Sequence, residues 1–213
     1  MNKRHILCYG DSNTWGFDAA NAGRFDDDLR WTMQLARLLG EEWLLAENGV
    51  NGRTTVFEDP INEGLNGLEH LTPAMRAHAP LDLLVVMLGT NDCKQRFSAT
   101  AQNIADGLRR LVLKAQTLLV WRALPRILVV APMIIDPRIY DTPEAVAGMG
   151  AGCVEKSRAL PALMTRVAQE TGCDFMDSNP HVMPCQTDWM HLSPQSNAPL
   201  AAALHHKILE MMG

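Results

Sequence analysis

Four polar segments of the sequence carry the residue types that acyl transfer needs: a hydroxyl nucleophile, an imidazole base, a carboxylate and hydrogen-bond donors. The first segment is Gly10-Asp11-Ser12-Asn13, which directly follows the apolar run 6–9. A serine at the end of a strand, after a glycine that permits a tight turn, exposes its hydroxyl and its backbone N–H. Taken alone, the segment fits an ordinary Asp-Ser turn or a helix N-cap equally well.

Asp188 and His191 stand three residues apart, just before the last helical pattern of the chain. On a turn, this spacing brings a carboxylate to one imidazole nitrogen and leaves the other nitrogen free to take a proton from serine. Serine needs such a base because its hydroxyl is a weak nucleophile near neutral pH. In isolation, a solvated Asp–His pair that caps the following helix is the commoner arrangement.

Two further segments offer hydrogen-bond donors for a developing oxyanion. Gly49 and Gly52 follow the second apolar run, and two glycines in four residues allow unusual backbone angles that leave amides bare. Asn91 lies in the segment 88–92, after the third run, and carries a side-chain amide. Alone, the glycine segment is more often just a loop, and an isolated Asn more often forms an Asx turn.

Short apolar runs alternate with longer amphipathic stretches along the chain, and this pattern predicts the elements that would position the four segments. Strands are expected over 6–9, 43–47, 81–88, 127–131 and 174–176, and helices over 31–39, 67–76, 100–119, 153–171 and 194–212. The alternation indicates an α/β fold, with a parallel sheet covered by helices on both sides. Ligands bind such sheets beyond the carboxyl ends of the strands, where three of the four segments would meet.

Length and composition fit one globular domain over residues 1–213, with 47% hydrophobic and 20% charged residues. A net charge of −5, without a basic run interleaved with aromatics, argues against a nucleic-acid partner. We expect no membrane segment, because no run approaches the roughly 20 apolar residues that span a bilayer. Five scattered cysteines and the lack of a signal-peptide pattern favour reduced thiols in a cytoplasmic protein. No histidine or cysteine spacing is typical of a metal site.

Together, the four segments resemble the SGNH hydrolases, a branch of the GDSL-type esterases named after Ser, Gly, Asn and His in four blocks. The resemblance is greatest to the bacterial arylesterase/acyltransferase subgroup, because the segments 10–16, 53–55 and 88–94 all agree with it. It extends from Ile6 to the last helix. It implies a flavodoxin-like three-layer α/β/α sandwich, with a five-stranded parallel sheet in the order 2-1-3-4-5.

The resemblance also implies a role for each candidate residue. Ser12 corresponds to the nucleophile, with Asp188 and His191 as its acid–base pair. The oxyanion hole would consist of the Ser12 and Gly52 backbone N–H groups and the Asn91 side chain. Gly52 is preferred to the earlier glycine of its segment because the family's glycine sits just before a polar residue and a threonine.

The implied activity is that of a serine esterase that cleaves small acetyl or aryl esters through an acyl-enzyme and also transfers the acyl group to other nucleophiles. It requires no metal and no organic cofactor. Two alternative activities would use the same catalytic residues: that of a carbohydrate O-deacetylase and that of a lysophospholipase- or thioesterase-like hydrolase. An inactive flavodoxin-like binding module is the alternative from another class, but the four intact polar segments argue against it.

Two residues and one longer stretch have no assigned role in the catalytic machinery. Trp15 is expected to form the part of the pocket wall that contacts an apolar or aromatic portion of the substrate. Burial of this tryptophan in the core is an equally good interpretation. Asn197 stands where relatives often have a histidine, and we interpret it as structural. The stretch from Met133 to Gly152 matches no part of the family pattern, so it leaves the natural acyl group and alcohol open. The resemblance to the arylesterase subgroup is also compatible with assembly of this chain into a homo-oligomer.

Overall fold

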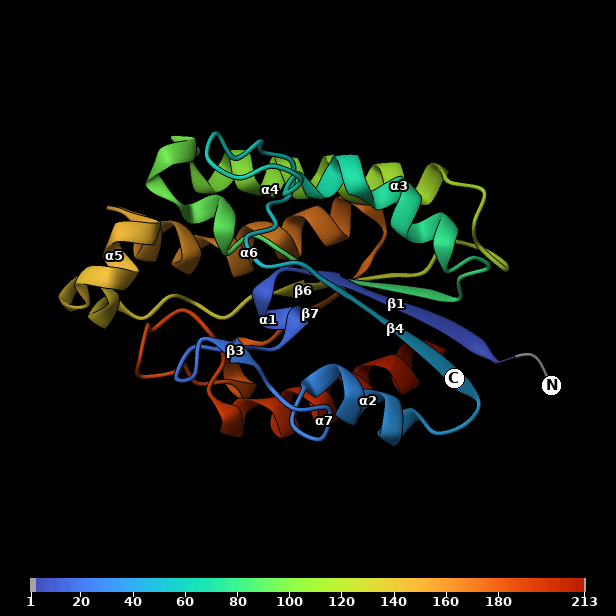
Figure 1. Ribbon diagram of the computed structural model, residues 1–213. Coiled ribbons are helices and arrows are strands. Elements are labelled where there is room, and N and C mark those ends of the chain that lie inside the picture. The colour runs from blue at the N-terminus through green and yellow to red at the C-terminus, as the bar shows by residue number, and fades with distance from the viewer. Residues whose placement is uncertain (1–2, 213) are drawn as a thin grey trace.

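A computed structural model describes residues 3–212 (Figure 1). Its centre is a parallel sheet in the order β4-β1-β5-β6-β7. The strands of this sheet are β1 (Arg4–Gly10), β4 (Trp43–Gly49), β5 (Leu83–Met87), β6 (Ile127–Ala131) and β7 (Asp174–Asp177). Counted along the chain without the two short strands of a separate hairpin, this is the order 2-1-3-4-5 that the resemblance implied.

Helices cover both faces of the sheet, as the alternating pattern predicted. On one face lie α3 (Gly67–Ala77), α4 (Ala101–Thr117) and α6 (Cys153–Thr171), and on the other lie α2 (Trp31–Leu39) and α7 (Asn197–Met212) (Figure 1). The chain therefore forms the three-layer α/β/α sandwich of the flavodoxin-like class.

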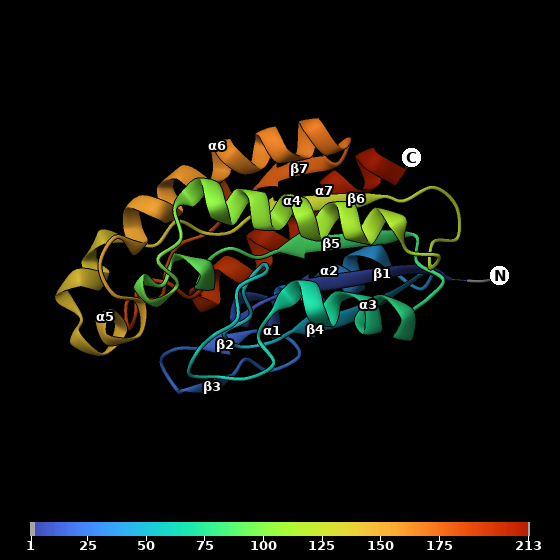
Figure 2. The same ribbon diagram turned by 90° about the horizontal axis from the view of Figure 1, so that it is seen from above.

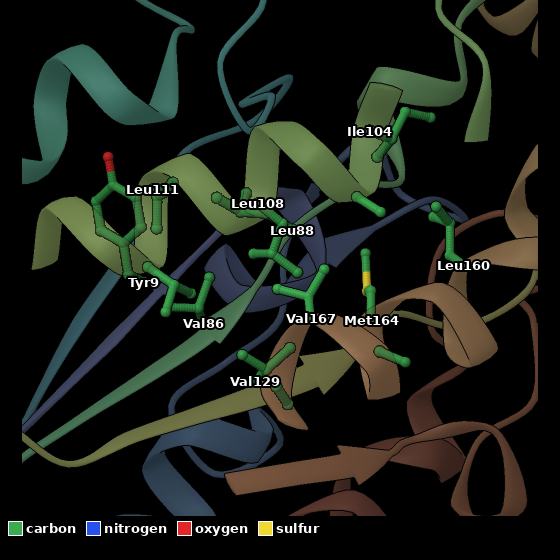
Figure 3. Packing of buried hydrophobic residues seen from close by; sticks show 14 of the residues in the cluster. Tyr9, Val86, Leu88, Ile104, Leu108, Leu111, Val129, Leu160, Met164 and Val167 are labelled. Atoms are coloured by element: carbon green, nitrogen blue, oxygen red, sulfur yellow. The ribbon is translucent and has the colours of Figure 1, made fainter. Parts of the chain in front are cut away.

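Alternate residues of the central strands face the two helical layers, so both faces of the sheet are buried. In β5, Leu84 and Val86 belong to the core under α3, α4 and α6, whereas Leu83 and Val85 belong to the core under α2 and α7. All four side chains are at most 1% exposed. Figure 3 shows the first of these cores, in which side chains of α4 and α6 meet those of the strands: Leu108, Leu111, Leu160, Met164 and Val167 with Tyr9, Val86 and Val129.

All five predicted strands and all five predicted helices are present, and the differences lie at their ends. The helices α2 and α6 and the strand β6 span the predicted residues. The strand predicted over 81–88 is shorter, because Leu81 exchanges hydrogen bonds with Val120 and Arg122 outside the sheet. The helix predicted from Pro194 starts with a 3-10 turn, and α7 itself begins at Asn197.

Several short elements have no counterpart in the prediction, because one turn of helix or two residues of strand leave no periodic pattern. They include α1 (Ser12–Trp15), the hairpin of β2 (Phe17–Asp18) with β3 (Gly23–Arg24), and α5 (Pro143–Met149). In both views, α1, the hairpin and α5 lie toward the end of the molecule opposite the start of β1 (Figure 2). This is the carboxyl end of the sheet. Within residues 3–212, no helix is both long and apolar enough to cross a membrane.

Gly49, the last residue of β4, allows α1 to pack directly against the sheet edge. A Cβ atom at this position would lie 2.1 Å from the backbone nitrogen of Trp15. We therefore expect Gly49→Ala to lower the free energy of unfolding by about 1–3 kcal/mol, the usual cost of overpacking a core. Urea unfolding measures the change, with Gly148→Ala as the control, because a Cβ there would meet nothing within 4 Å. An unchanged midpoint for Gly49→Ala would contradict the close approach.

Candidate active site

Ser12 is the first residue of α1, at the point where the chain leaves β1. The turn is fixed at both ends: Asp11 Oδ1 accepts a hydrogen bond from the Asn13 N–H at 2.9 Å, and the Gly16 N–H donates to the Ser12 carbonyl at 2.9 Å. Gly16 has φ +88°, a left-handed conformation that glycine adopts without a Cβ clash. The Ser12 hydroxyl is thereby held at the carboxyl edge of the sheet, beside the segments that follow β4 and β5.

The structure brings Ser12, His191 and Asp188 into one hydrogen-bonded chain. Ser12 Oγ lies 2.8 Å from His191 Nε2, and His191 Nδ1 lies 2.5 Å from Asp188 Oδ2. The other carboxylate oxygen of Asp188 accepts hydrogen bonds from the backbone N–H groups of His191 at 3.1 Å and Met190 at 3.2 Å. With a separation of three residues, the turn folds the Asp188 carboxylate back onto the His191 imidazole.

The Asp188 carboxylate is stabilised in its charged form. Burial favours the neutral acid, but the hydrogen bond and charge of the His191 ring, together with the two backbone N–H groups, outweigh burial. They hold the pKa of Asp188 below its ordinary value. Asp188 is therefore ionised at neutral pH and faces the imidazole as a negative charge.

Asn13 holds the turn that carries His191, a role that its sequence position did not reveal. Its side-chain oxygen accepts from the Leu192 N–H at 2.9 Å, and its Nδ2 lies 3.4 Å from the Met190 carbonyl. The side chain therefore contacts the residues on both sides of His191. The Asn13 carbonyl in turn accepts from Trp31 Nε1 at 2.8 Å.

Asn197 is buried and joins the two helices of its layer, which agrees with its structural interpretation. Its Oδ1 accepts from the Trp31 N–H at 3.0 Å, and its Nδ2 donates to the carbonyls of Ser193 and Pro194. The starts of α2 and α7 are therefore fixed to each other close to the turn of His191.

The three predicted oxyanion donors line the same cavity as Ser12 Oγ and His191. Gly52 has φ +87°, the left-handed conformation for which a glycine was expected there. Asn91 is 7% exposed, and its Nδ2 donates to the Arg53 carbonyl at 3.1 Å, with Asp11 Oδ2 at 3.5 Å. Among residues 3–212, the backbone N–H groups of Ser12 and Gly52 have no acceptor. Two of the residues that line the cavity thus have backbone N–H groups without an acceptor in the described part of the chain, and the third carries a side-chain amide held by the Arg53 carbonyl.

The cavity has a volume of about 240 Å³, which suits a small ligand. The aromatic ring on its wall is Phe17 of the short hairpin, 4.5 Å from the His191 ring between centroids. Trp15, the predicted substrate wall, is not among the described residues that line the cavity. Its ring packs against the Arg24 guanidinium at 5.1 Å and lies 6.4 Å from the Phe17 ring.

The stretch from Met133 to Gly152, which matched no family pattern, contributes to the cavity through α5. Gly148 and Met149 line the side of the cavity that also contains Lys94 and Arg96. No pattern in the sequence indicated this contribution, because α5 reaches the site only through the tertiary fold.

Two buried carboxyls lie beneath this arrangement, and neither contacts the Ser12 hydroxyl. Burial raises the pKa of Asp11 to about 6, against the Asn13 hydrogen bond and the charges of nearby cationic groups. Burial likewise raises the pKa of Asp92 to about 6, against hydrogen bonds from the Thr55 hydroxyl and N–H. Asp11 thus holds the serine turn, and Asp92 ties the loop after β4 to the loop after β5.

Cys93 adjoins the site but is packed away from it. The thiol is buried, it donates to the Gly89 carbonyl at 3.4 Å, and burial raises its pKa. A thiol in this state is a poor nucleophile. Within the described part of the chain, no group of three or more His, Cys, Asp or Glu side chains is arranged to hold a metal ion.

The sequence and the fold of this chain are similar to those of known hydrolases. The family model of GDSL-like lipases and acylhydrolases matches residues 8–205. The chain is similar to the structure of the aryl esterase of M. smegmatis, with 32% identity, a TM-score of 0.90, and 98% of this chain and 100% of that chain covered. It is also similar to a carbohydrate acetylesterase family member from Sinorhizobium meliloti, with 34% identity, a TM-score of 0.92 and 99% of each chain covered. Among curated proteins, none matches this chain.

Proposed function

Because the chain belongs to the GDSL-like lipase/acylhydrolase family and is a carboxylic ester hydrolase, we propose that it cleaves small esters with Ser12 as nucleophile. His191 is the general base and Asp188 supports it. The single observation that supports this assignment best is the unbroken chain of hydrogen bonds from Ser12 Oγ through the imidazole to Asp188, at the edge of a cavity. Residues 1–213 act as one domain in this proposal.

The reaction proceeds in two steps. His191 Nε2 takes the proton of the Ser12 hydroxyl while the oxygen attacks the ester carbonyl. The resulting oxyanion accepts hydrogen bonds from the Ser12 and Gly52 N–H groups and from the Asn91 amide. As the tetrahedral intermediate collapses, the C–O bond to the alcohol breaks and the imidazolium returns its proton to the leaving oxygen. Water, deprotonated by His191, then attacks the acyl-enzyme and releases the acid and Ser12.

Acyl transfer uses the same second step, with an alcohol in place of water. Phe17 and two methionines line the cavity, and such an apolar wall favours an organic alcohol over water near the acyl-enzyme. We therefore propose that the enzyme also transfers acyl groups when an alcohol is present. The ratio of ester product to free acid, measured with an added alcohol, tests this step.

Asn91→Ala should lower kcat by about 10²–10³-fold, the usual loss for one oxyanion donor. KM should change much less, because the hydrogen bond strengthens only as negative charge develops on the carbonyl oxygen. Steady-state kinetics on p-nitrophenyl acetate separate the two constants. If KM rose while kcat held, Asn91 would bind the substrate and would not belong to the oxyanion hole.

Asp188→Asn should move the pH dependence of the reaction as well as its rate. The negative charge of Asp188, 2.5 Å from Nδ1, faces the imidazolium that forms when His191 takes the serine proton. The base must be neutral to act, so kcat/KM rises with pH through one ionisation. Without the carboxylate charge the proton leaves the base more easily, and the inflection should move to lower pH. The plateau of kcat/KM should fall by about 10⁴-fold.

The control for this profile is wild-type enzyme on the same activated ester. An inflection that stayed in place, or moved to higher pH, would show that Asp188 does not support the base. Another carboxylate would then have to replace it in the mechanism.

A carbohydrate O-deacetylase is the second candidate, because the chain is 34% identical to a carbohydrate acetylesterase family member over 99% of its length. A panel of p-nitrophenyl esters of increasing acyl length, assayed beside acetylated sugars, separates the candidates. An aryl esterase should prefer the aryl acetates, and the short acyl chains should react best in a cavity of about 240 Å³. A higher kcat/KM on the acetylated sugars would favour the deacetylase.

A further inference from the structure

Two cationic side chains line the cavity together with Ser12 and His191. Lys94 and Arg96 both come from the segment that follows β5, and none of the described residues lining the cavity is Asp or Glu. The protein as a whole carries a formal net charge of −5. The positive wall is therefore a local feature, opposite in sign to the average surface.

Within the described part of the chain, Lys94 has no partner for its charge. It is half-buried, and across residues 3–212 no carboxylate oxygen lies within 4.0 Å of its ammonium group and no acceptor takes its hydrogen bonds. Partial burial lowers the pKa of Lys94, and the charge of Arg96 lowers it further, against the attraction of more distant carboxylates. The Lys94 ammonium has lost part of its hydration and has gained no partner in exchange. An anion that binds beside it therefore stabilises its charged form.

Arg96 is fixed in place by two contacts with the protein. Its Nη2 donates to the Gly148 carbonyl at 3.2 Å, and its Nη1 lies 3.8 Å from Asp59 Oδ1. The Asp59 side chain is fully buried, and the same oxygen accepts the Ile61 N–H at 2.9 Å. These contacts occupy only part of the guanidinium, which has five N–H donors. They hold the group at the cavity while donors remain for a ligand.

Of the carboxylates whose charge attracts Lys94, Asp59 has the largest effect, and it lies against Arg96 at 3.8 Å. The other two leave Lys94 without a partner. Asp11 and Asp92 lie behind the lining of the cavity, where Asn13 and Thr55 donate hydrogen bonds to them. Burial raises the pKa of each to about 6, so each is partly protonated near neutral pH. The positive charge of the wall is thus only partly balanced by the protein itself.

We propose that Lys94 and Arg96 bind a carboxylate carried by the ester, so that the preferred substrates are small esters with an anionic group on the acyl or the alcohol portion. This inference rests on the proposed esterase function and specifies its substrate class. The anion replaces water around the Lys94 ammonium, and Arg96 orients it. A cavity of about 240 Å³ limits the substrate to a short acid or a single ring.

The test compares two pairs of esters, each with a charged and a neutral member of similar size. Phenyl hemisuccinate and methyl phenyl succinate place the difference on the acyl side, and 4-acetoxybenzoate and 4-acetoxybenzamide place it on the alcohol side. Each kcat/KM is divided by the rate constant of hydroxide-catalysed hydrolysis of the same ester, which removes intrinsic reactivity. We expect wild-type enzyme to favour the anionic member of at least one pair by about tenfold, a difference of about 1.4 kcal/mol.

Lys94→Met removes the charge and keeps the length of the side chain, so it should reduce this preference to near one. Lys94→Arg should retain most of the preference, and Lys94→Gln serves if the methionine variant does not fold. Lys114→Met makes the same change of charge on an exposed position of α4 and should leave the preference unaltered. Succinate and 4-hydroxybenzoate should inhibit hydrolysis of the neutral esters competitively, with a weaker effect on Lys94→Met.

The outcomes separate this inference from the proposed function. If wild-type enzyme hydrolyses both members of each pair equally well, the anion-binding role is overturned and the esterase stands. The same holds if the preference survives in Lys94→Met. If wild-type enzyme hydrolyses neither member of either pair, nor p-nitrophenyl acetate, the esterase function itself fails.

Discussion

Ser12→Ala is expected to lower kcat on p-nitrophenyl acetate by about 10⁵–10⁶-fold while the protein stays folded. The hydroxyl is hydrogen-bonded to the base at 2.8 Å and lines the same cavity as Gly52, whose N–H has no acceptor among residues 3–212. Without it no acyl-enzyme forms, and only the small effects of binding and of the oxyanion donors remain. The loss should fall on kcat, because alanine leaves the shape of the cavity almost unchanged.

Thermal unfolding is the control for this variant. Ser12 Oγ has one hydrogen-bond partner in the described part of the chain, the His191 ring, so the melting temperature should change by only a few degrees. Activity within severalfold of wild type, in a protein freed of contaminating esterases, would remove Ser12 from the mechanism. A burst of p-nitrophenol in wild type that is absent from Ser12→Ala would support an acyl-enzyme.

His191→Ala should be nearly as damaging as Ser12→Ala, because the imidazole moves a proton in both steps. The His191 ring is the group within hydrogen-bonding distance of Ser12 Oγ, at 2.8 Å. His206→Ala is the matched control, since His206 is exposed on α7 and should keep wild-type activity. Retention of most activity in His191→Ala would mean that another base serves Ser12.

The double variant Ser12→Ala/His191→Ala sharpens this prediction. Residues that act as a unit are strongly non-additive, so the double variant should be no slower than the more damaged single variant. Fully additive losses would show that the two side chains contribute to different steps.

Much of the fold followed from the sequence because its signals were local and strong. The continuously apolar runs at residues 83–88 and 127–131 predicted strands buried on both faces, and β5 and β6 are buried throughout. The order of the sheet came from the family resemblance and not from the runs themselves. Strand ends were less predictable, because a residue such as Leu81 can exchange its hydrogen bonds with a loop instead of the sheet.

The candidate site was predictable where residue type and spacing carried the chemistry. Asp188 and His191 lie three residues apart, so a single turn brings their side chains together, and Ser12 follows a strand whose end is at the sheet edge. Asn13 and Phe17 were missed as site residues because their contacts depend on the tertiary fold. Asn13 reaches a turn 177 residues away, and the short hairpin, which has no periodic pattern, puts Phe17 on the wall where Trp15 was expected.

The most direct test of the account is covalent labelling with a fluorophosphonate, because only an activated serine displaces fluoride from this reagent. Wild-type protein should gain the mass of one phosphonyl group, and peptide mapping should locate it on Ser12. His191→Ala should label far more slowly, and Ser12→Ala should not label at all. Labelling at another residue, or wild-type protein that remains unlabelled while it hydrolyses p-nitrophenyl acetate, would contradict the proposal that Ser12 is the nucleophile.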